Sequence, residues 1–346
     1  MLDDLKYIND HDSVDTLGIA ERQWQQLLKE FEVPIWPSTE PIANIVFAGM
    51  GGSALAAVVS LSWPTVDLPF EVVRNYDLPA YVGPHTLVIV SSYSGNTEET
   101  LNALSEAEAK AAQIAVITGG GKLAEIAKTK NYPVVILPDA GQPRYAVLYS
   151  IKALLVILRA ANVLPQAAAR FAELTQAAAF LKQSVQAWIA TVPAANNRAK
   201  QIAQEIMGKS LVVYAGPKLF PAAYKWKISA NENAKHLAWV NQYPEFNHNE
   251  FIGWTKQPVD KPYAVVDLRS KLEHPRIQKR FEVTERLLSG SRPAPIVVEV
   301  QGETLLEQLL WAIALGDFVT LYLALLSGLD PAPVDLIEKF KQSLDQ

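Results

Sequence analysis

Short apolar runs alternate with longer segments of helical composition through the first half of the chain. The apolar runs predict strands at residues 44–48, 70–73, 87–90, 113–117 and 133–137. The segments between them predict helices at residues 51–61, 97–112 and 122–128. Strands that alternate with helices in this way are typical of a parallel sheet covered by helices on both faces.

The second half of the chain repeats this plan after a long helical stretch. Residues 146–181 contain alanine-rich segments and predict helix, with Pro165 as a helix start. Strands are then expected at residues 211–214, 264–268 and 296–300, and helices at residues 221–236, 276–288, 305–326 and 334–344. The pattern therefore predicts an α/β fold with two parallel-sheet domains, which we place at residues 1–155 and 156–346.

The composition narrows the classes of function. The chain has 346 residues, enough for about two domains, and 49% of them are hydrophobic. A net charge of -5 disfavours a nucleic-acid partner, for which a basic face would be expected. The chain has no cysteine, so disulfides, thiolate zinc sites and cysteine nucleophiles are excluded.

No segment predicts a signal peptide or a membrane span. The first fifteen residues are acidic and lack a basic region followed by an apolar one. The longest apolar stretch, residues 311–326, is interrupted by Asp317 and is shorter than a typical span. We therefore expect a soluble, cytoplasmic protein with no membrane partner.

The segment SSYSGNTEET, residues 91–100, follows the third apolar run directly. Ser92, Ser94 and Thr97 each offer a hydroxyl donor, and Gly95 lets the backbone come close to a ligand. A helix that begins here would add free backbone N–H groups. Together these groups predict an anion site that contains no Lys or Arg. The alternative is a Ser/Thr-rich helix cap, with two glutamates complementing the helix dipole.

A second glycine-rich turn, AGMGGSA at residues 48–54, follows the first apolar run. Gly51 and Gly52 allow a tight turn from strand to helix, and Ser53 presents its hydroxyl at the helix start. The turn is an imperfect match to the dinucleotide-binding fingerprint, although Asp67 lies near the distance expected for a ribose-binding acid. Nucleotide binding is disfavoured, because that fingerprint has no role for the hydroxyl cluster.

The pair of turns GMGGSA and SSYSGNTEET resembles the signature of the sugar isomerase (SIS) domain. In the second half, the blocks SANENAK, PEFNHNE, DP and IEKFK resemble the bifunctional phosphoglucose/phosphomannose isomerases; they lie at residues 229–235, 244–250, 330–331 and 337–341. The resemblance implies two SIS-type, flavodoxin-like domains, each a parallel sheet with helices on both faces. Ala54 departs from the family pattern, in which glycine is common, and is expected to narrow the space beside the ligand.

The resemblance also implies which residues hold the phosphate of a hexose 6-phosphate substrate. The hydroxyl groups would come from Ser53, Ser92, Ser94 and Thr97, and the backbone of the two turns from Gly51, Gly52 and Gly95. The reacting end of the sugar would then belong to the second domain and its closing C-terminal helix.

Four charged or titratable residues are implied as catalytic. Glu232 would be the base that moves a proton between C2 and C1, and His248 the group that opens the sugar ring. Lys341 would be a cation near the ring oxygen, and Arg144 would stabilise the charge of an enediolate. From the residues alone, each has a plainer interpretation, because helical glutamates, loop histidines, and lysines and arginines are most often solvated at the surface.

The choice of Lys341 over Lys339 depends on the pattern of the last helix. Ile337, Phe340 and Leu344 predict its buried face, and Lys341 lies next to that face.

The implied function is a metal-independent aldose–ketose isomerase without a cofactor, which interconverts glucose 6-phosphate and mannose 6-phosphate with fructose 6-phosphate. Ring opening and proton transfer would pass through a cis-enediol intermediate. The resemblance also implies a homodimer in which His248 reaches the partner's active site. The alternative from another class is a catalytically silent SIS regulator that binds a sugar phosphate, although no basic DNA-binding segment precedes residue 44.

Overall fold

The chain forms two α/β units, which the computed structural model describes for residues 1–256 and 262–344, without the side chain of Gln342. One unit comprises Arg22–Ala179, and the other joins Met1–Glu21 to Phe180–Gln346. The predicted boundary at residue 155 lies inside helix α6, Val147–Ala160. The predicted fold class, α/β with two parallel sheets, is confirmed.

The unit Arg22–Ala179 is built on a five-stranded parallel sheet of order β2-β1-β3-β4-β5. This is the flavodoxin-like order, in which the chain reverses direction across the sheet between β1 and β3. The strands are β1 Asn44–Gly49, β2 Phe70–Val73, β3 Thr86–Ser92, β4 Gln113–Thr118 and β5 Val134–Ile136. All five lie where the sequence predicts them, within a residue or two at each end.

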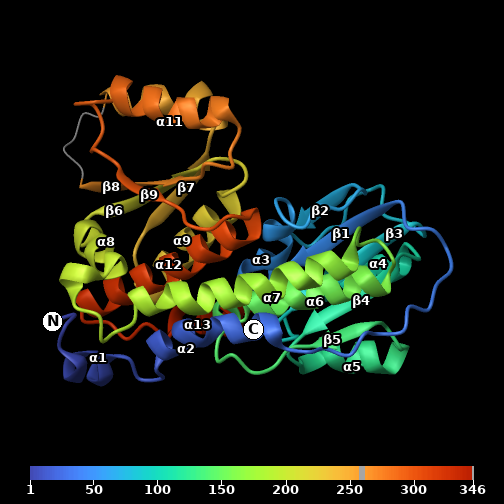
Figure 1. Ribbon diagram of the computed structural model, residues 1–346. Coiled ribbons are helices and arrows are strands. Elements are labelled where there is room, and N and C mark those ends of the chain that lie inside the picture. Colours follow the sequence, from blue (N-terminus) through green and yellow to red (C-terminus); the bar gives the residue numbers. More distant parts are fainter. Residues whose placement is uncertain (257–261, 345–346) are drawn as a thin grey trace. The chain divides into compact units, whose positions relative to one another are not determined.

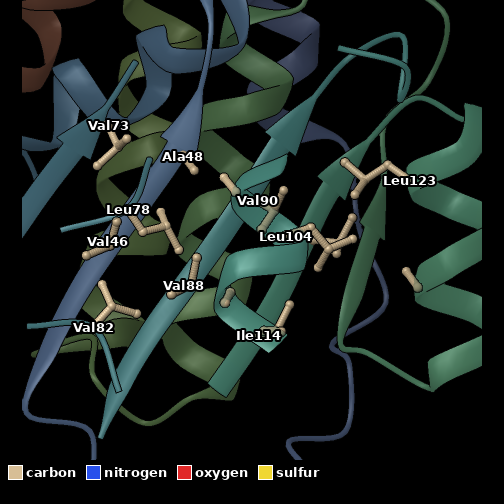
Figure 2. Close-up of a cluster of buried hydrophobic side chains, with 14 residues drawn as sticks. Val46, Ala48, Val73, Leu78, Val82, Val88, Val90, Leu104, Ile114 and Leu123 are labelled. Carbon is tan, nitrogen blue, oxygen red and sulfur yellow. The ribbon is translucent and has the colours of Figure 1, made fainter. Parts of the chain in front are cut away.

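Helices cover both faces of this sheet (Figure 1). They are α3 Gly51–Ser60, α4 Glu98–Ala109, α5 Gly121–Lys130, α6 Val147–Ala160 and α7 Ala167–Ser184, with the 3₁₀ turns η1 Gln23–Leu28 and η2 Pro143–Tyr145. Figure 2 shows Val90 of the sheet beside Leu104 of α4, with Val46 and Leu123 of α5 on opposite sides of the same apolar cluster. The predicted helix at residues 146–181 is divided in two, since the backbone turns at Asn162 and Gln166, both with positive φ.

The second unit contains a four-stranded parallel sheet of order β7-β6-β8-β9. Its strands are β6 Ser210–Ala215, β7 Ala238–Gln242, β8 Tyr263–Arg269 and β9 Ile296–Glu299. The order matches that of the first sheet with one strand fewer. Strand β7 is missing from the sequence prediction, because AWVNQ is short, ends in two polar residues and lies at the sheet edge.

Helices on the two sides of this sheet complete the second unit (Figure 1). The long helices are α8 Arg198–Ile206, α9 Phe220–Asn233, α11 Pro275–Leu287, α12 Leu305–Leu326 and α13 Asp335–Leu344. The N-terminal helices are α1 Leu5–His11 and α2 Thr16–Arg22, and the short elements are η3 Val185–Ala187, η4 Ala194–Asn196, η5 Glu245–His248, α10 Glu250–Gly253 and η6 Trp254–Lys256. The sequence analysis predicts neither α8 nor the N-terminal helices.

Helix α12 is the core helix of this unit, and it spans the residues that the sequence predicts. It spans 22 residues and could cross a membrane by length and composition, yet 89% of its most apolar window is buried within the protein. Its buried Asp317 does not interrupt the helix. Lys225 of α9 pairs with Asp317, and Ser229 donates a hydrogen bond to the same carboxylate at 2.8 Å. A buried charge is tolerated when it is paired in this way.

Candidate functional site

The hydroxyl-rich turn connects β3 to α4. Ser92 ends the strand and is buried, and its Oγ lies 2.8 Å from Oγ1 of Thr97 and 3.4 Å from Oγ of Ser94. The same oxygen accepts a hydrogen bond from the N–H of Gly95 at 3.1 Å. The structure therefore brings three of the predicted phosphate-binding hydroxyls together on one turn.

Helix capping does not explain this turn. Thr97 holds the N-cap position of α4, but its side chain makes no capping hydrogen bond. Its hydroxyl lies against Ser92 instead. The backbone N–H groups of the first helical turn therefore have no partner in the N-cap side chain, and such groups favour an anion.

Gly95 lies where two turns of the protein approach each other closely. It is buried, its φ is +70°, and a Cβ atom on it would lie 1.8 Å from the carbonyl oxygen of Gly120. The turn before α5 also contacts this segment, since Leu123 N–H donates to Gly95 O at 3.0 Å. Gly95 thus allows two neighbouring turns of the protein to meet.

The glycine-rich turn between β1 and α3 is joined to the hydroxyl-rich turn. The Oγ of Ser53 accepts a hydrogen bond from Tyr93 N–H at 3.0 Å, and Ser91 Oγ donates to the carbonyl of Ser53 at 3.2 Å. Both turns follow neighbouring strands at the carboxyl edge of the sheet, where ligands of open α/β sheets bind. Ala54 is completely buried in α3, so its methyl group packs in the core and not beside a ligand.

Arg144 lies on η2, next to the start of α3. A Cβ atom on Gly52 would be 3.1 Å from the backbone nitrogen of Arg144, so the missing side chain lets this segment approach the helix. Arg144 is only 1% exposed, and its guanidinium lies 4.6 Å from the centre of the Tyr145 ring and donates to Gln142 at 3.4 Å. The plain alternative, a surface arginine in a loop, is wrong.

Glu232 lies in the last turn of α9 and is partly buried. The next residue, Asn233, is fully buried and donates a hydrogen bond to Thr320 of α12 at 3.0 Å. One turn earlier, Ser229 bonds to Asp317. Residues before and after Glu232 in the sequence therefore fix this end of α9 to α12 through polar contacts.

His248 ends the short 3₁₀ element η5 and is exposed. Its neighbours hold the loop in place. Asn247 donates to Thr284 of α11 and accepts from Arg280, both at 3.0 Å, and Glu250 accepts from Asn241 of β7 at 2.7 Å. An exposed imidazole thus stands between anchored residues, which is a suitable support for proton transfer.

The prediction that one face of the last helix, α13, is buried is wrong. Ile337, Phe340 and Leu344 are 43%, 62% and 56% exposed, so they do not form a buried face. Lys341 is exposed as well, and its Nζ pairs with Glu338 of the same helix at 2.8 Å. An amphipathic pattern indicates which face can be buried, but not whether a partner covers it.

The predicted site residues fall into two groups, each within one unit. The phosphate-binding hydroxyls, the glycines and Arg144 belong to Arg22–Ala179. Glu232, His248 and Lys341 belong to the other unit.

Two family models cover most of the chain. The SIS domain model matches residues 41–164, and the model of the bacterial phospho-glucose isomerase C-terminal SIS domain matches residues 195–344. The chain is 31% identical over 325 residues to the bifunctional phosphoglucose/phosphomannose isomerase of Aquifex aeolicus, a match that covers 93% of this chain and 94% of that protein. The chain belongs to the bifunctional phosphoglucose/phosphomannose isomerase family. The predicted resemblance is therefore confirmed.

A further relative agrees with this assignment, and a solved structure agrees with the fold. The isomerase of the same name from Caldicellulosiruptor bescii is 34% identical over 329 residues, which cover 92% of this chain and 96% of that one. The solved structure is that of a glucose-6-phosphate isomerase like protein from Thermus thermophilus, with a TM-score of 0.65 at 18% identity. The match covers 99% of this chain and 98% of that one. The latter supports the SIS fold alone.

The structure of this phosphoglucose/phosphomannose isomerase family member also contains residues that the sequence analysis leaves without a role. Tyr93 stands between Ser92 and Ser94 in the sequence, and its hydroxyl donates a hydrogen bond to Asp139 at 3.2 Å. Burial raises the pKa of its phenol. Glu250 accepts hydrogen bonds from Tyr214 and Asn241. Tyr93 lies in the motif SSYSGNTEET and Glu250 in the motif PEFNHNE. Their closeness in sequence to the predicted site residues is the signal that could have identified them.

Proposed function

We propose that the protein is an aldose–ketose isomerase that interconverts glucose 6-phosphate and mannose 6-phosphate with fructose 6-phosphate. The main support is membership, over nearly the whole length, of a family named for these two activities. The convergence of three hydroxyls beside an uncapped helix start supports a phosphorylated substrate.

The substrate phosphate binds at the two turns of the unit Arg22–Ala179. Ser92, Ser94 and Thr97 supply hydroxyls from one turn, where the bond between Ser92 and Thr97 uses one of their two protons and leaves the other for the phosphate. Ser53 donates from the other turn, where its oxygen already accepts from Tyr93 N–H. The backbone N–H groups around Gly51 and Gly52 complete the cradle. No lysine or arginine is required, because oriented N–H and O–H groups bind a dianion by themselves.

The chemistry requires a ring-opening group, a base and a group that stabilises negative charge. His248 moves the proton that breaks the ring bond between C1 and O5, which gives the open aldehyde. Glu232 removes the proton from C2, and the electron pair of that C–H bond forms the C1=C2 double bond, so that O1 becomes the enediolate oxygen. The proton then returns from Glu232 to C1 while the hydroxyl proton of O2 passes to O1, which leaves a ketone at C2 and a hydroxyl at C1. Arg144 stabilises the enediolate, and Lys341 stabilises charge at the ring oxygen.

The same intermediate accounts for two aldose substrates. In the enediolate, C2 is planar, and the difference between glucose and mannose no longer exists. Proton return to either face of C2 gives either aldose, provided that the site admits both orientations. No metal takes part in this scheme. Among the residues that the structure describes, no group of three or more His, Asp or Glu side chains is arranged as a metal site.

We further propose that the protein acts as a homodimer, in which His248 serves the active site of the other subunit. Its exposed position on an anchored loop supports such a role.

A coupled assay with fructose 6-phosphate in the presence of EDTA tests the proposal. Formation of both glucose 6-phosphate and mannose 6-phosphate is expected. If neither forms, the isomerase proposal fails, and binding of fructose 6-phosphate without turnover would favour the regulator. Loss of turnover with EDTA, restored by a divalent cation, would remove the metal-independent mechanism while leaving the enzyme assignment.

A further inference from the structure

Among the residues that the structure describes, no long helix covers the edge strand β7 on one face of the second sheet. The pairing of β6 with β7 sets Trp239 opposite Val212 and Asn241 opposite Tyr214, so these four side chains share a face. Helix α11 packs on this face near β8, through Ile277 and Phe281. Near β7, the described cover consists of short elements: η5, the four residues of α10 and the three residues of η6.

A pocket of about 350 Å³ opens at this place, inside the second unit. Its walls include Val212, Trp239, Glu250, Trp254 and Tyr263. The rings of Trp254 and Tyr263 meet edge to face, with centroids 5.4 Å apart. The volume lies in the range that holds a small organic molecule.

Glu250 is the charged residue among these walls, and its described partners are neutral. Its two oxygens accept hydrogen bonds from the hydroxyl of Tyr214 and from the amide of Asn241. Trp254 Nε1 donates to the hydroxyl of Tyr214 at 3.0 Å, which orients that hydroxyl toward the carboxylate. Burial, and then the nearby carboxylate, raise the pKa of Tyr214, so the phenol stays protonated. Within residues 1–256 and 262–344, no cation is ion-paired with Glu250.

We propose that this pocket binds a small organic cation, such as a quaternary ammonium or a substituted amine. A cation gains from aromatic walls, because the face of an indole or phenol ring is negative. It also gains from a carboxylate that is fixed by neutral donors and lacks a described counter-ion. The apolar walls fit the alkyl groups that such cations carry. A sugar phosphate would be repelled by Glu250, so the pocket is separate in its chemistry from the proposed phosphate site.

Isothermal titration calorimetry with choline tests this proposal. The measurement does not depend on isomerase activity. The comparison ligand is the neutral isostere in which a tert-butyl group replaces the trimethylammonium group. The two ligands have the same shape, so a difference in affinity reports the charge. We expect choline to bind more tightly than the isostere, by about threefold to thirtyfold, the range of one cation–π contact. Equal affinity, or no binding of choline, would overturn the proposal.

Two variants assign the binding to this pocket. Trp239→Leu keeps an apolar side chain on the partly exposed edge strand but removes the aromatic face, and Glu250→Gln removes the charge. Each is expected to reduce the preference for choline over its isostere, since one of the two sources of attraction for the cation is removed. Ile252→Ala is the matched control, because Ile252 lies on the same α10, is 69% exposed and is not a pocket wall. If Ile252→Ala weakens choline binding as much as Trp239→Leu does, the cation binds elsewhere and the proposal is wrong. If Glu250→Gln disturbs the folding of the protein, Trp239→Leu is the variant that decides.

Discussion

The hydroxyl of Ser92 lies 2.8 Å from the hydroxyl of Thr97, and this contact joins the end of β3 to the start of α4. Ser92 is 1% exposed, so the contact is a fixed part of the fold. Thr97, which would otherwise cap its helix, is thereby directed to the strand end. The turn therefore has grouped hydroxyls and an uncapped helix start together, and this combination is what distinguishes an anion site from an ordinary cap.

Replacing Thr97 by valine tests this arrangement. The change keeps the shape of the side chain and removes one donor to the phosphate. We expect the KM for fructose 6-phosphate to rise by about 10- to 100-fold, the loss of a hydrogen bond to a charged group, with a smaller change in kcat. Steady-state kinetics measures both constants.

Thr100→Val is the matched control for that experiment. Thr100 lies on the same helix, is 1% exposed, and its hydroxyl has no hydrogen-bond partner among the described residues. Removing an unpaired buried hydroxyl is expected to leave KM unchanged. An equal rise of KM in both variants would mean that the helix, and not the Thr97 hydroxyl, is responsible.

The two glycine turns are expected to respond differently to alanine. Gly95 and Gly51 both have positive φ, +70° and +49°. At Gly51 nothing lies near an added Cβ, so the cost is the backbone conformation alone, about 1–2 kcal/mol. At Gly95 the Cβ would also collide with the carbonyl of Gly120. Urea unfolding should show a clearly larger loss for Gly95→Ala; equal losses would contradict the close approach of the two turns.

Glu232→Gln should separate binding from chemistry. The amide keeps the size of the side chain and cannot accept the C2 proton, so kcat is expected to fall by at least about 100-fold. Binding of fructose 6-phosphate, measured by calorimetry, should change little, because the proposed phosphate site does not include Glu232. The control is Glu205→Gln, at an exposed position paired with Arg198 on α8. Unchanged turnover in Glu232→Gln would remove this residue from the mechanism.

The sequence predicts local elements well where the hydrophobic pattern is strong. All five strands of the first sheet were predicted, since each is a continuous apolar run. Strand β7 was missed because an edge strand needs fewer apolar residues, and its Trp239 is 49% exposed. Packing between distant elements was less predictable. The apolar stripe of α13 suggested a buried face that the structure does not have, and Arg144 is buried where the loop composition suggested exposure.

The buried pair between Lys225 and Asp317 is expected to be important for the stability of the second unit. Both side chains are 1% exposed. Asp317→Ala would leave an ammonium group buried without its counter-ion, at a cost of about 3–5 kcal/mol in the free energy of unfolding. The double variant Lys225→Met with Asp317→Leu should recover most of this loss, because neither charge remains. A double variant as unstable as Asp317→Ala would mean that the pair itself, and not the uncompensated charge, determines stability.

Hybrid dimers test whether His248 serves the other subunit. Glu232→Gln and His248→Ala subunits, each inactive alone, would form one intact site per mixed dimer if an active site takes Glu232 from one chain and His248 from the other. Since random exchange gives half mixed dimers, each with one of two sites intact, we expect activity to return to about a quarter of that of the unmodified protein. Subunit exchange is verified with differently tagged chains. A hybrid of Glu232→Gln with Glu232→Ala is the control and should stay inactive. If exchange occurs and the first mixture also stays inactive, both residues act within one chain, and the shared site is wrong.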